Sequence, residues 1–89
     1  MKLVINDCFG GFGINYEIAT KYGFYKLDDI RTNEKLIELI ESGIDCNDDV
    51  SKLSVVEIPD EATDYYINNY DGAESVIYVV DGKIHFTYA

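Results

Sequence analysis

The segment Cys8–Gly13 reads CFGGFG and places three glycines within four residues, directly after an apolar run. A glycine-rich loop between a strand and a helix can cradle a phosphate with its backbone N–H groups. Here Tyr16 stands where G-x-G-x-x-G needs its third glycine, the loop contains no Lys or Arg, and Asp7 adjoins it. These features favour a structural role, in which the glycines adopt positive φ so that the chain reverses tightly from strand to helix.

The aromatic residues of this loop should hold it in place. We expect Phe9 and Phe12 to anchor the loop in the core, so that its structural residues are Gly10, Gly11, Phe12 and Gly13. A nucleotide-binding loop and a loop that contacts a partner are the alternatives.

A second segment, Asp45–Asp49, has carboxylates at cation-loop spacing. Asp45, Asn47 and Asp49 match positions one, three and five of a calcium loop. Position six is Val50 where glycine is needed, and position twelve is Val56 where glutamate is needed. We predict a solvated loop, with a weak cation site as the alternative, and no metal or cofactor.

The residues that could act as nucleophile or base are few and scattered. His85 is the single histidine, and neither Cys8 nor Cys46 stands at a spacing that places it beside His85. Nucleophilic catalysis needs a nucleophile, a base and an orienting group in contact, and zinc needs four ligands. We therefore predict no catalytic residues and no enzyme. Whether Cys8 and Cys46 form a disulfide is a question that the sequence leaves open.

Net charge is the strongest global signal. Seventeen Asp and Glu against seven Lys and Arg give −10. Contacts to nucleic-acid phosphates need a basic surface, so we exclude direct nucleic-acid binding and binding to anionic membranes, and expect attraction to a basic protein. The predicted partner-binding residues are Asp45, Asp48, Asp49, Glu57, Asp60, Glu61, Asp64 and Tyr65. The alternative is an ordinary solvated face.

Three of these acids have a predicted structural role. Asp60 follows Pro59 and can cap a helix, with Glu61 and Asp64 in its first turn. The loop acids Asp45, Asp48 and Asp49 have no such role and are the better candidates for contact with a partner.

The 89 residues are enough for one domain, 1–89. Lys2–Asn6 reads as a buried strand, followed by a helix over 16–22 that Asn15 caps and Gly23 ends. Apolar residues at helical spacing predict a second helix, which Thr32 or Asn33 caps and Gly43 ends.

The second half of the chain should begin with a strand over 53–58 and a helix from Asp60 to about Tyr70 that ends at Gly72. Asp81-Gly82 then predicts a two-residue hairpin turn between strands 76–80 and 83–88. This turn pairs Val79 with Ile84, Ile77 with Phe86, Ser75 with Tyr88, Val80 with Lys83, Tyr78 with His85 and Val76 with Thr87. We expect the Ile77–Phe86 face to be core and the Tyr78–His85 face to be half polar.

The order β-α-α-β-α-β-β predicts an α+β fold with helices packed on one face of a small sheet and a C-terminal hairpin. The long connection between the first two strands favours their parallel pairing. Without a signal peptide or an apolar run of membrane length, we expect a cytoplasmic protein.

Three short motifs resemble a group of short phage and prophage proteins. These are the C-[FY]-G-G-F-G opening, V-E-I-P-D at 56–60 and Y-D-G at 70–72; Ile14-Asn15 departs from the Leu-Ser of that group. The resemblance implies a phage context, and small acidic phage proteins include anti-CRISPR inhibitors. It carries over no functional residue.

One expected function combines the acidic net charge, the lack of a catalytic set of residues and the resemblance to phage proteins. The chain should be a non-enzymatic protein, monomer or homodimer, that binds and inhibits a basic, nucleic-acid-binding defence protein of the host cell. Mimicry of nucleic acid is one way in which it would do so. The alternatives are a small-ligand or nucleotide-binding domain that uses Gly10–Gly13, and a homo-oligomeric module assembled through the hairpin.

Overall fold

The computed structural model describes residues 1–24 and 29–88 and confirms the α+β class. Of the segment 24–27, which the sequence leaves between loop and short extended piece, only Phe24 lies within the described residues. In the described part the elements are β1 (Lys2–Asn6), α1 (Tyr16–Tyr22), the 3₁₀ helix η2 (Ile30–Thr32), α2 (Glu34–Glu41), β2 (Leu53–Glu57), β3 (Asp64–Tyr70), β4 (Ala73–Val80) and β5 (Lys83–Tyr88).

Strands β1 and β2 form a two-stranded antiparallel ribbon. Lys2 pairs with Glu57 and Asn6 with Leu53, so the expected parallel pairing is wrong. Residues 7–52 leave β1 at Asn6 and return to the same end of the ribbon, where β2 begins. Strands β1 and β2 are antiparallel because the chain returns to the end of the ribbon that it left. A long connection gives parallel strands only when it crosses to the opposite end of the first strand.

Strands β3, β4 and β5 form a second, antiparallel sheet. The predicted helix from Asp60 to Tyr70 is therefore wrong, because this segment contains strand β3. Its sequence DYYINNY alternates and is rich in Tyr, which favours a strand, while its asparagines disfavour a helix interior. Asp71 (φ 51°) and Gly72 (φ 93°) make a two-residue turn into β4. The glycine that was expected to end a helix closes a hairpin.

The C-terminal hairpin has the predicted register at all six pairs, from Ser75–Tyr88 to Val80–Lys83. The predicted buried face is wrong. Val76 is fully buried, whereas Ile84 is 66% and Phe86 56% exposed. The face that carries Val76 and Tyr78 packs on the core, and the face that carries Ile77 and Phe86 points away from it.

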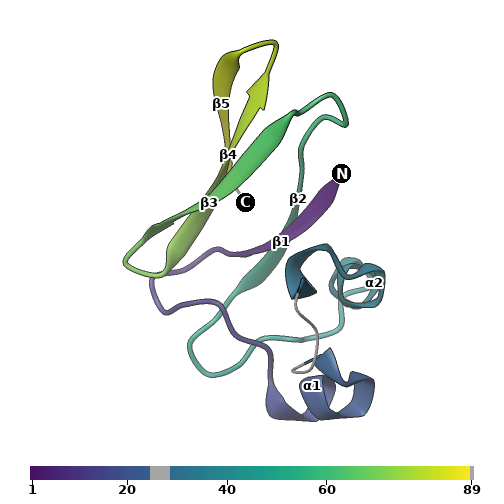
Figure 1. The fold of residues 1–89 in the computed structure, drawn as a ribbon. Helices are drawn as coiled ribbons and strands as arrows, with labels where there is room; N and C mark the ends of the chain where they lie inside the picture. Colours follow the sequence, from purple (N-terminus) through teal and green to yellow (C-terminus); the bar gives the residue numbers. More distant parts are fainter. Residues whose placement is uncertain (25–28, 89) are drawn as a thin grey trace.

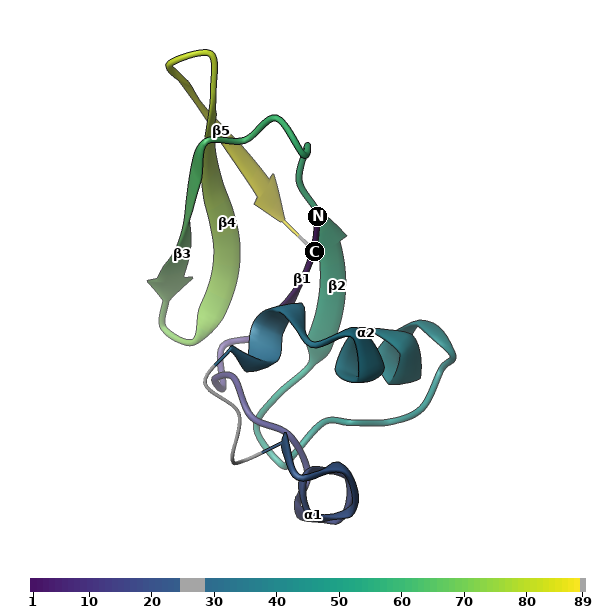
Figure 2. The same cartoon turned by 45° about the vertical axis from the view of Figure 1, so that its right-hand side comes forward.

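The β1–β2 ribbon is the middle layer of the molecule (Figures 1 and 2). Val4 on one side packs with Leu36, Leu39 and other residues of the helical part. Leu3 and Ile5 on the other side pack with Val76 of the second sheet. This explains why β1 is apolar on both faces, and it places helices on one side of the ribbon and the β3–β4–β5 sheet on the other.

Helices α1 and α2 begin and end where the sequence predicts. Asn15 Oδ1 accepts the N–H of Ile18 (2.9 Å), and Asn33 Oδ1 accepts the N–H of Leu36 (3.0 Å). Gly23 ends α1 with a left-handed backbone. No helix in the described residues has the length and apolar character needed to cross a membrane.

Candidate functional site

The glycine loop lies against two other backbone segments. A Cβ on Gly10 would overlap the carbonyl of Val50, and one on Gly13 would overlap the carboxylate of Asp48. A Cβ on Gly72, in the β3–β4 turn, would lie 2.7 Å from the Phe9 carbonyl oxygen. The glycines therefore allow close approach of backbone, which supports the structural role.

The expected tight reversal is wrong, because residues 7–15 separate β1 from α1 and, of the loop glycines, only Gly11 has a positive φ (140°). Phe9 is also not an anchor, since it is 71% exposed. Phe12 is one: it packs on the helical core, and the Arg31 guanidinium lies 4.1 Å from its ring centroid. The Asp48 carboxylate beside Gly13 opposes phosphate binding.

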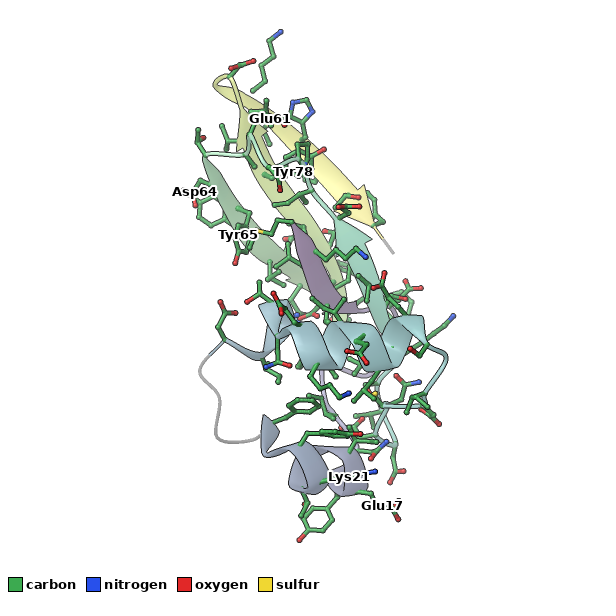
Figure 3. The ribbon with its side chains drawn as sticks, turned by 90° about the vertical axis from the view of Figure 1, so that its right-hand side faces the viewer. Glu17, Lys21, Glu61, Asp64, Tyr65 and Tyr78 are labelled. Carbon is green, nitrogen blue, oxygen red and sulfur yellow. The ribbon has the colours of Figure 1, made fainter. Side chains whose placement is uncertain are left out.

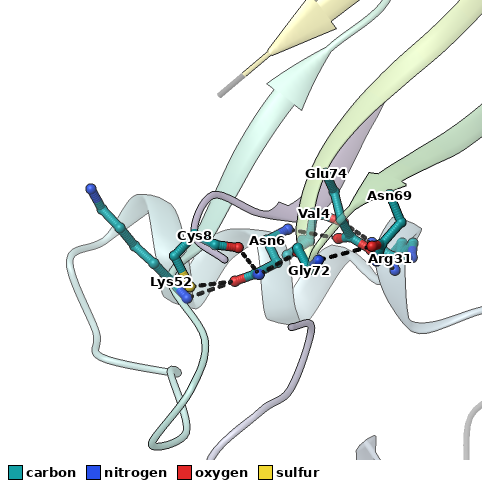
Figure 4. A network of polar contacts seen from close by, with 8 residues as sticks. All are labelled: Val4, Asn6, Cys8, Arg31, Lys52, Asn69, Gly72 and Glu74. Carbon is teal, nitrogen blue, oxygen red and sulfur yellow. Dashed lines mark hydrogen bonds and ion pairs between the residues drawn. The ribbon is translucent and has the colours of Figure 1, made fainter. Parts of the chain in front are cut away.

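Asn6 joins the loop to both sheets (Figure 4). Its side chain is fully buried and its Nδ2 donates to the carbonyls of Cys8 (2.8 Å) and Gly72 (2.7 Å). Its Oδ1 accepts the N–H of Lys52 (2.7 Å). Every donor of this amide is used, as a buried polar group requires, so Asn6 has a structural function.

A buried ion pair lies beside Asn6. Arg31 Nη1 and Nη2 donate to Glu74 Oε1 (2.8 Å) and Oε2 (2.7 Å), and Nη1 also donates to the Val4 carbonyl (3.1 Å). Glu74 Oε1 accepts the backbone N–H of Asn6 (2.7 Å). The Glu74 side chain is only 3% exposed. This bidentate pair connects η2, β1 and β4 and is not free to bind a partner.

The loop acids of 45–49 have structural roles that the sequence prediction missed. Asp45 Oδ1 accepts the N–H of Asn47 (3.0 Å) and Asp48 Oδ1 accepts the N–H of Val50 (3.0 Å). These contacts are Asx turns, which hold a loop without any ligand. Asp49 is exposed and has no hydrogen bond or ion pair among the described residues. The described residues contain no group of three or more His, Cys, Asp or Glu arranged for a metal ion.

The acids after β2 do not cap a helix, because the described residues after Pro59, 60–88, contain strands and no helix. Asp60 Oδ1 instead accepts from the Met1 ammonium (2.8 Å), which lowers the pKa of Asp60. Asp64 Oδ2 accepts the Tyr66 hydroxyl (2.8 Å), which raises the pKa of Tyr66. Glu61 is exposed and has no such contact in the described part of the chain.

The eight predicted partner-binding residues therefore form two groups. Asp45, Asp48 and Asp49 precede β2, while Glu57 and the others end it or follow it. Strand β2 has five residues, which at about 3.3 Å per residue separates the groups by roughly 17 Å. Figure 3 shows Glu61, Asp64 and Tyr65 at the opposite end of the molecule from Glu17 and Lys21. Tyr65 is half-buried on the core side of β3.

The thiols and the imidazole serve no shared site. The Cys8 thiol lies 3.2 Å from the Val50 carbonyl oxygen, and the Gly10 backbone N–H lowers the pKa of Cys8. Burial raises the pKa of Cys46. Both cysteines are free thiols. His85 stacks on Tyr78 with ring centroids 5.2 Å apart, so its structure is that of a sheet-surface histidine.

The second sheet has an exposed apolar surface that sequence reasoning missed. We define the outer sheet face by the large apolar residues on the side of β3–β5 opposite Val76: Tyr66, Tyr70, Ile77, Val79, Ile84, Phe86 and Tyr88. Asp64, Asn68 and Ser75 lie on the same side of the sheet. Tyr66, Ile84 and Phe86 are 57%, 66% and 56% exposed. The signal was present in the sequence, because Asp71-Gly72 repeats the turn chemistry of Asp81-Gly82 and predicts a third strand.

Comparisons of the chain with protein families, with curated proteins and with solved structures found no match.

Proposed function

We propose that this chain is a non-enzymatic binding protein that occupies the nucleic-acid-binding surface of a basic partner protein. In the phage context that the resemblance implies, the partner is a defence protein of the host cell, and binding inhibits it as an anti-CRISPR protein would. The observation that carries the proposal is an excess of exposed carboxylates that the chain itself does not neutralise.

Several basic residues of the chain form ion pairs with its own acids. Lys2 pairs with Glu41, Lys35 with Glu38, and Arg31 with Glu74. Acids such as Asp49 and Glu61 are exposed and form no ion pair in residues 1–24 and 29–88, whereas exposed Glu57 lies opposite Lys2 in the ribbon. A net charge of −10 attracts a basic partner and speeds the encounter.

The spacing of the acids narrows the class of partner. Two acidic groups separated by the length of β2 need a basic surface that extends further than one small pocket. Surfaces that bind nucleic acid are basic and extended, because they follow successive phosphates. The expected result of binding is competition with nucleic acid.

The test is capture of proteins from a bacterial lysate on the immobilised chain, with identification of the captured proteins. We expect nucleic-acid-binding proteins that are released by high salt and by a DNA duplex added as competitor. The triple variant Asp49→Asn, Glu57→Gln and Glu61→Gln removes acids whose side chains form no hydrogen bond or ion pair in the described residues, and it should weaken capture. The control is the triple variant Asp7→Asn, Glu17→Gln and Glu34→Gln, which changes the net charge by the same amount at other positions of the chain. Capture that neither salt nor DNA reverses would contradict the proposal.

A further inference from the structure

The outer sheet face is continuous across all three strands of the sheet. In the register of the sheet, Tyr66, Ile77 and Phe86 lie side by side in one row, and Val79 and Ile84 lie in the next. Neighbouring strands are about 4.8 Å apart, so these side chains contact one another across the sheet. The result is one apolar patch rather than scattered exposed residues.

The structure does not need this patch for its own core. The opposite face of the same sheet supplies Val76, which packs with Leu3 and Ile5. On the outer face Ile84 and Phe86 are 66% and 56% exposed, while Ile77 and Val79 are half-buried. Monomeric proteins seldom expose a large contiguous apolar patch unless it binds something.

The charges around the patch indicate what it binds. Exposed acids lie at its corner and at both turns: Asp64, Asp71 and Asp81. Lys83 is the one basic residue among 64–88. A second copy of the chain would bring like charges together across the interface, with −10 on each copy. Charge complementarity therefore favours a different protein with a basic rim.

We propose that the outer sheet face is the docking surface for the partner, and that the partner presents an apolar patch edged by Lys and Arg. This inference rests on the proposed function and places the centre of the interface on the second sheet, so that the acids at the ends of β2 act on the encounter and not at that centre. The aromatic residues supply the buried centre of the interface, where most binding energy concentrates. The surrounding carboxylates supply orientation and a fast encounter.

The test compares two double variants in the capture experiment. The variant Ile84→Thr/Phe86→Thr replaces the two exposed apolar side chains at the centre of the patch by threonine. Threonine is chosen because it has a high propensity for strands. Phe9→Thr with Tyr16→Thr is the matched control, because these side chains are 71% and 83% exposed in other parts of the chain. We expect capture to fall about tenfold or more in the first variant, as for loss of a hot spot, and to stay unchanged in the control.

A second measurement does not depend on the fold of a variant. A photoreactive phenylalanine analogue at position 86 should crosslink the captured partner, and the same analogue at position 16 should not. Equal capture by the Ile84→Thr/Phe86→Thr variant, or crosslinking at 16 but not at 86, would overturn the inference and leave the proposed function standing.

The remaining outcomes separate the two proposals further. A homodimer of the wild-type chain in light scattering that dissociates in the Ile84→Thr/Phe86→Thr variant would show that a second copy occupies the face, and would overturn the inference. If the wild-type chain captures no protein that salt and DNA displace, the proposed function and the inference both fail.

Discussion

The two faces of the β3–β4–β5 sheet differ in burial more than in composition. The inner face contains Val76, which is fully buried, but also Glu74 and Tyr78. The outer face contains Ile84 and Phe86, which are more than half exposed. The face that the core uses therefore includes a buried carboxylate. The negative charge of Glu74 on this face is stabilised because Arg31 donates two hydrogen bonds to its carboxylate.

This difference shows what selects a buried face. A strand that is apolar on both sides can pack either way, and the choice depends on which side meets a complementary surface. The inner face meets Leu3, Ile5 and a guanidinium placed by η2. The outer face meets no such surface among the described residues and remains available for another molecule.

The largest expected effect comes from breaking the buried ion pair of the inner face. Glu74→Ala leaves the Asn6 N–H without its acceptor and the Arg31 guanidinium with the Val4 carbonyl but no carboxylate. Loss of one partner of a buried pair costs about 3–5 kcal/mol. Urea unfolding measures the change in the free energy of unfolding. Glu57→Ala, which removes an exposed carboxylate, is the control and should cost little. A loss below about 1 kcal/mol in Glu74→Ala would show that the inner face does not depend on this pair.

The next effect compares two valines on the same strand. Val76→Ala removes buried methyl groups from the inner face and should lower the free energy of unfolding by about 2 kcal/mol. Val79→Ala makes the same change on the outer face, where the side chain is half-buried, and should cost less than half as much. Equal losses in the same urea experiment would contradict the assignment of the two faces.

A smaller effect is expected for the exposed centre of the outer face. Ile84→Thr with Phe86→Thr should change the free energy of unfolding by no more than about 1 kcal/mol, since surface substitutions are usually near neutral. Thermal unfolding of the isolated chain measures this. Cooperative unfolding lost in this variant but kept in Phe9→Thr/Tyr16→Thr would show that the outer face stabilises the fold itself.

The smallest effect concerns one hydroxyl on the outer face. Tyr66 donates to Asp64, and this hydrogen bond and the nearby negative charge raise the pKa of Tyr66 above 10.0. The stabilisation from this contact is present below pH 10 and is lost as the pH rises through the raised pKa. Asp64→Ala should return the Tyr66 pKa toward its ordinary value in a tyrosine NMR titration. An unchanged pKa would show that the two side chains do not interact in solution.

Much of the local structure could be predicted, because local rules decide it. Asn15 and Asn33 cap helices in any context that leaves their side chains free, and Asp81-Gly82 sets the hairpin register through its backbone twist. The predicted helix at 60–70 failed because Gly72 suits both a helix end and a hairpin turn. The fully buried Asn6, which joins distant loops, could not be anticipated, since its side-chain partners are up to 66 residues away in the sequence.

The features of the candidate site also separate into those that the sequence predicts and those that only the tertiary structure decides. The acidic excess is a property of composition, and it predicts the kind of partner that the chain attracts. Where a partner would dock is a property of the tertiary structure, because the sequence places apolar residues on both faces of β4 and β5. Packing of one face on β1 and β2 leaves the other exposed.

The sequence by itself therefore determined the charge, the helix ends and the turn that pairs β4 with β5, since each depends on residues close together in the chain. Only the tertiary structure decided that β2 runs antiparallel to β1, that Glu74 is buried against Arg31 and that Ile84 and Phe86 are exposed. Each of these depends on the meeting of segments distant in sequence, and the free energy of burial belongs to the surfaces that meet rather than to either segment alone.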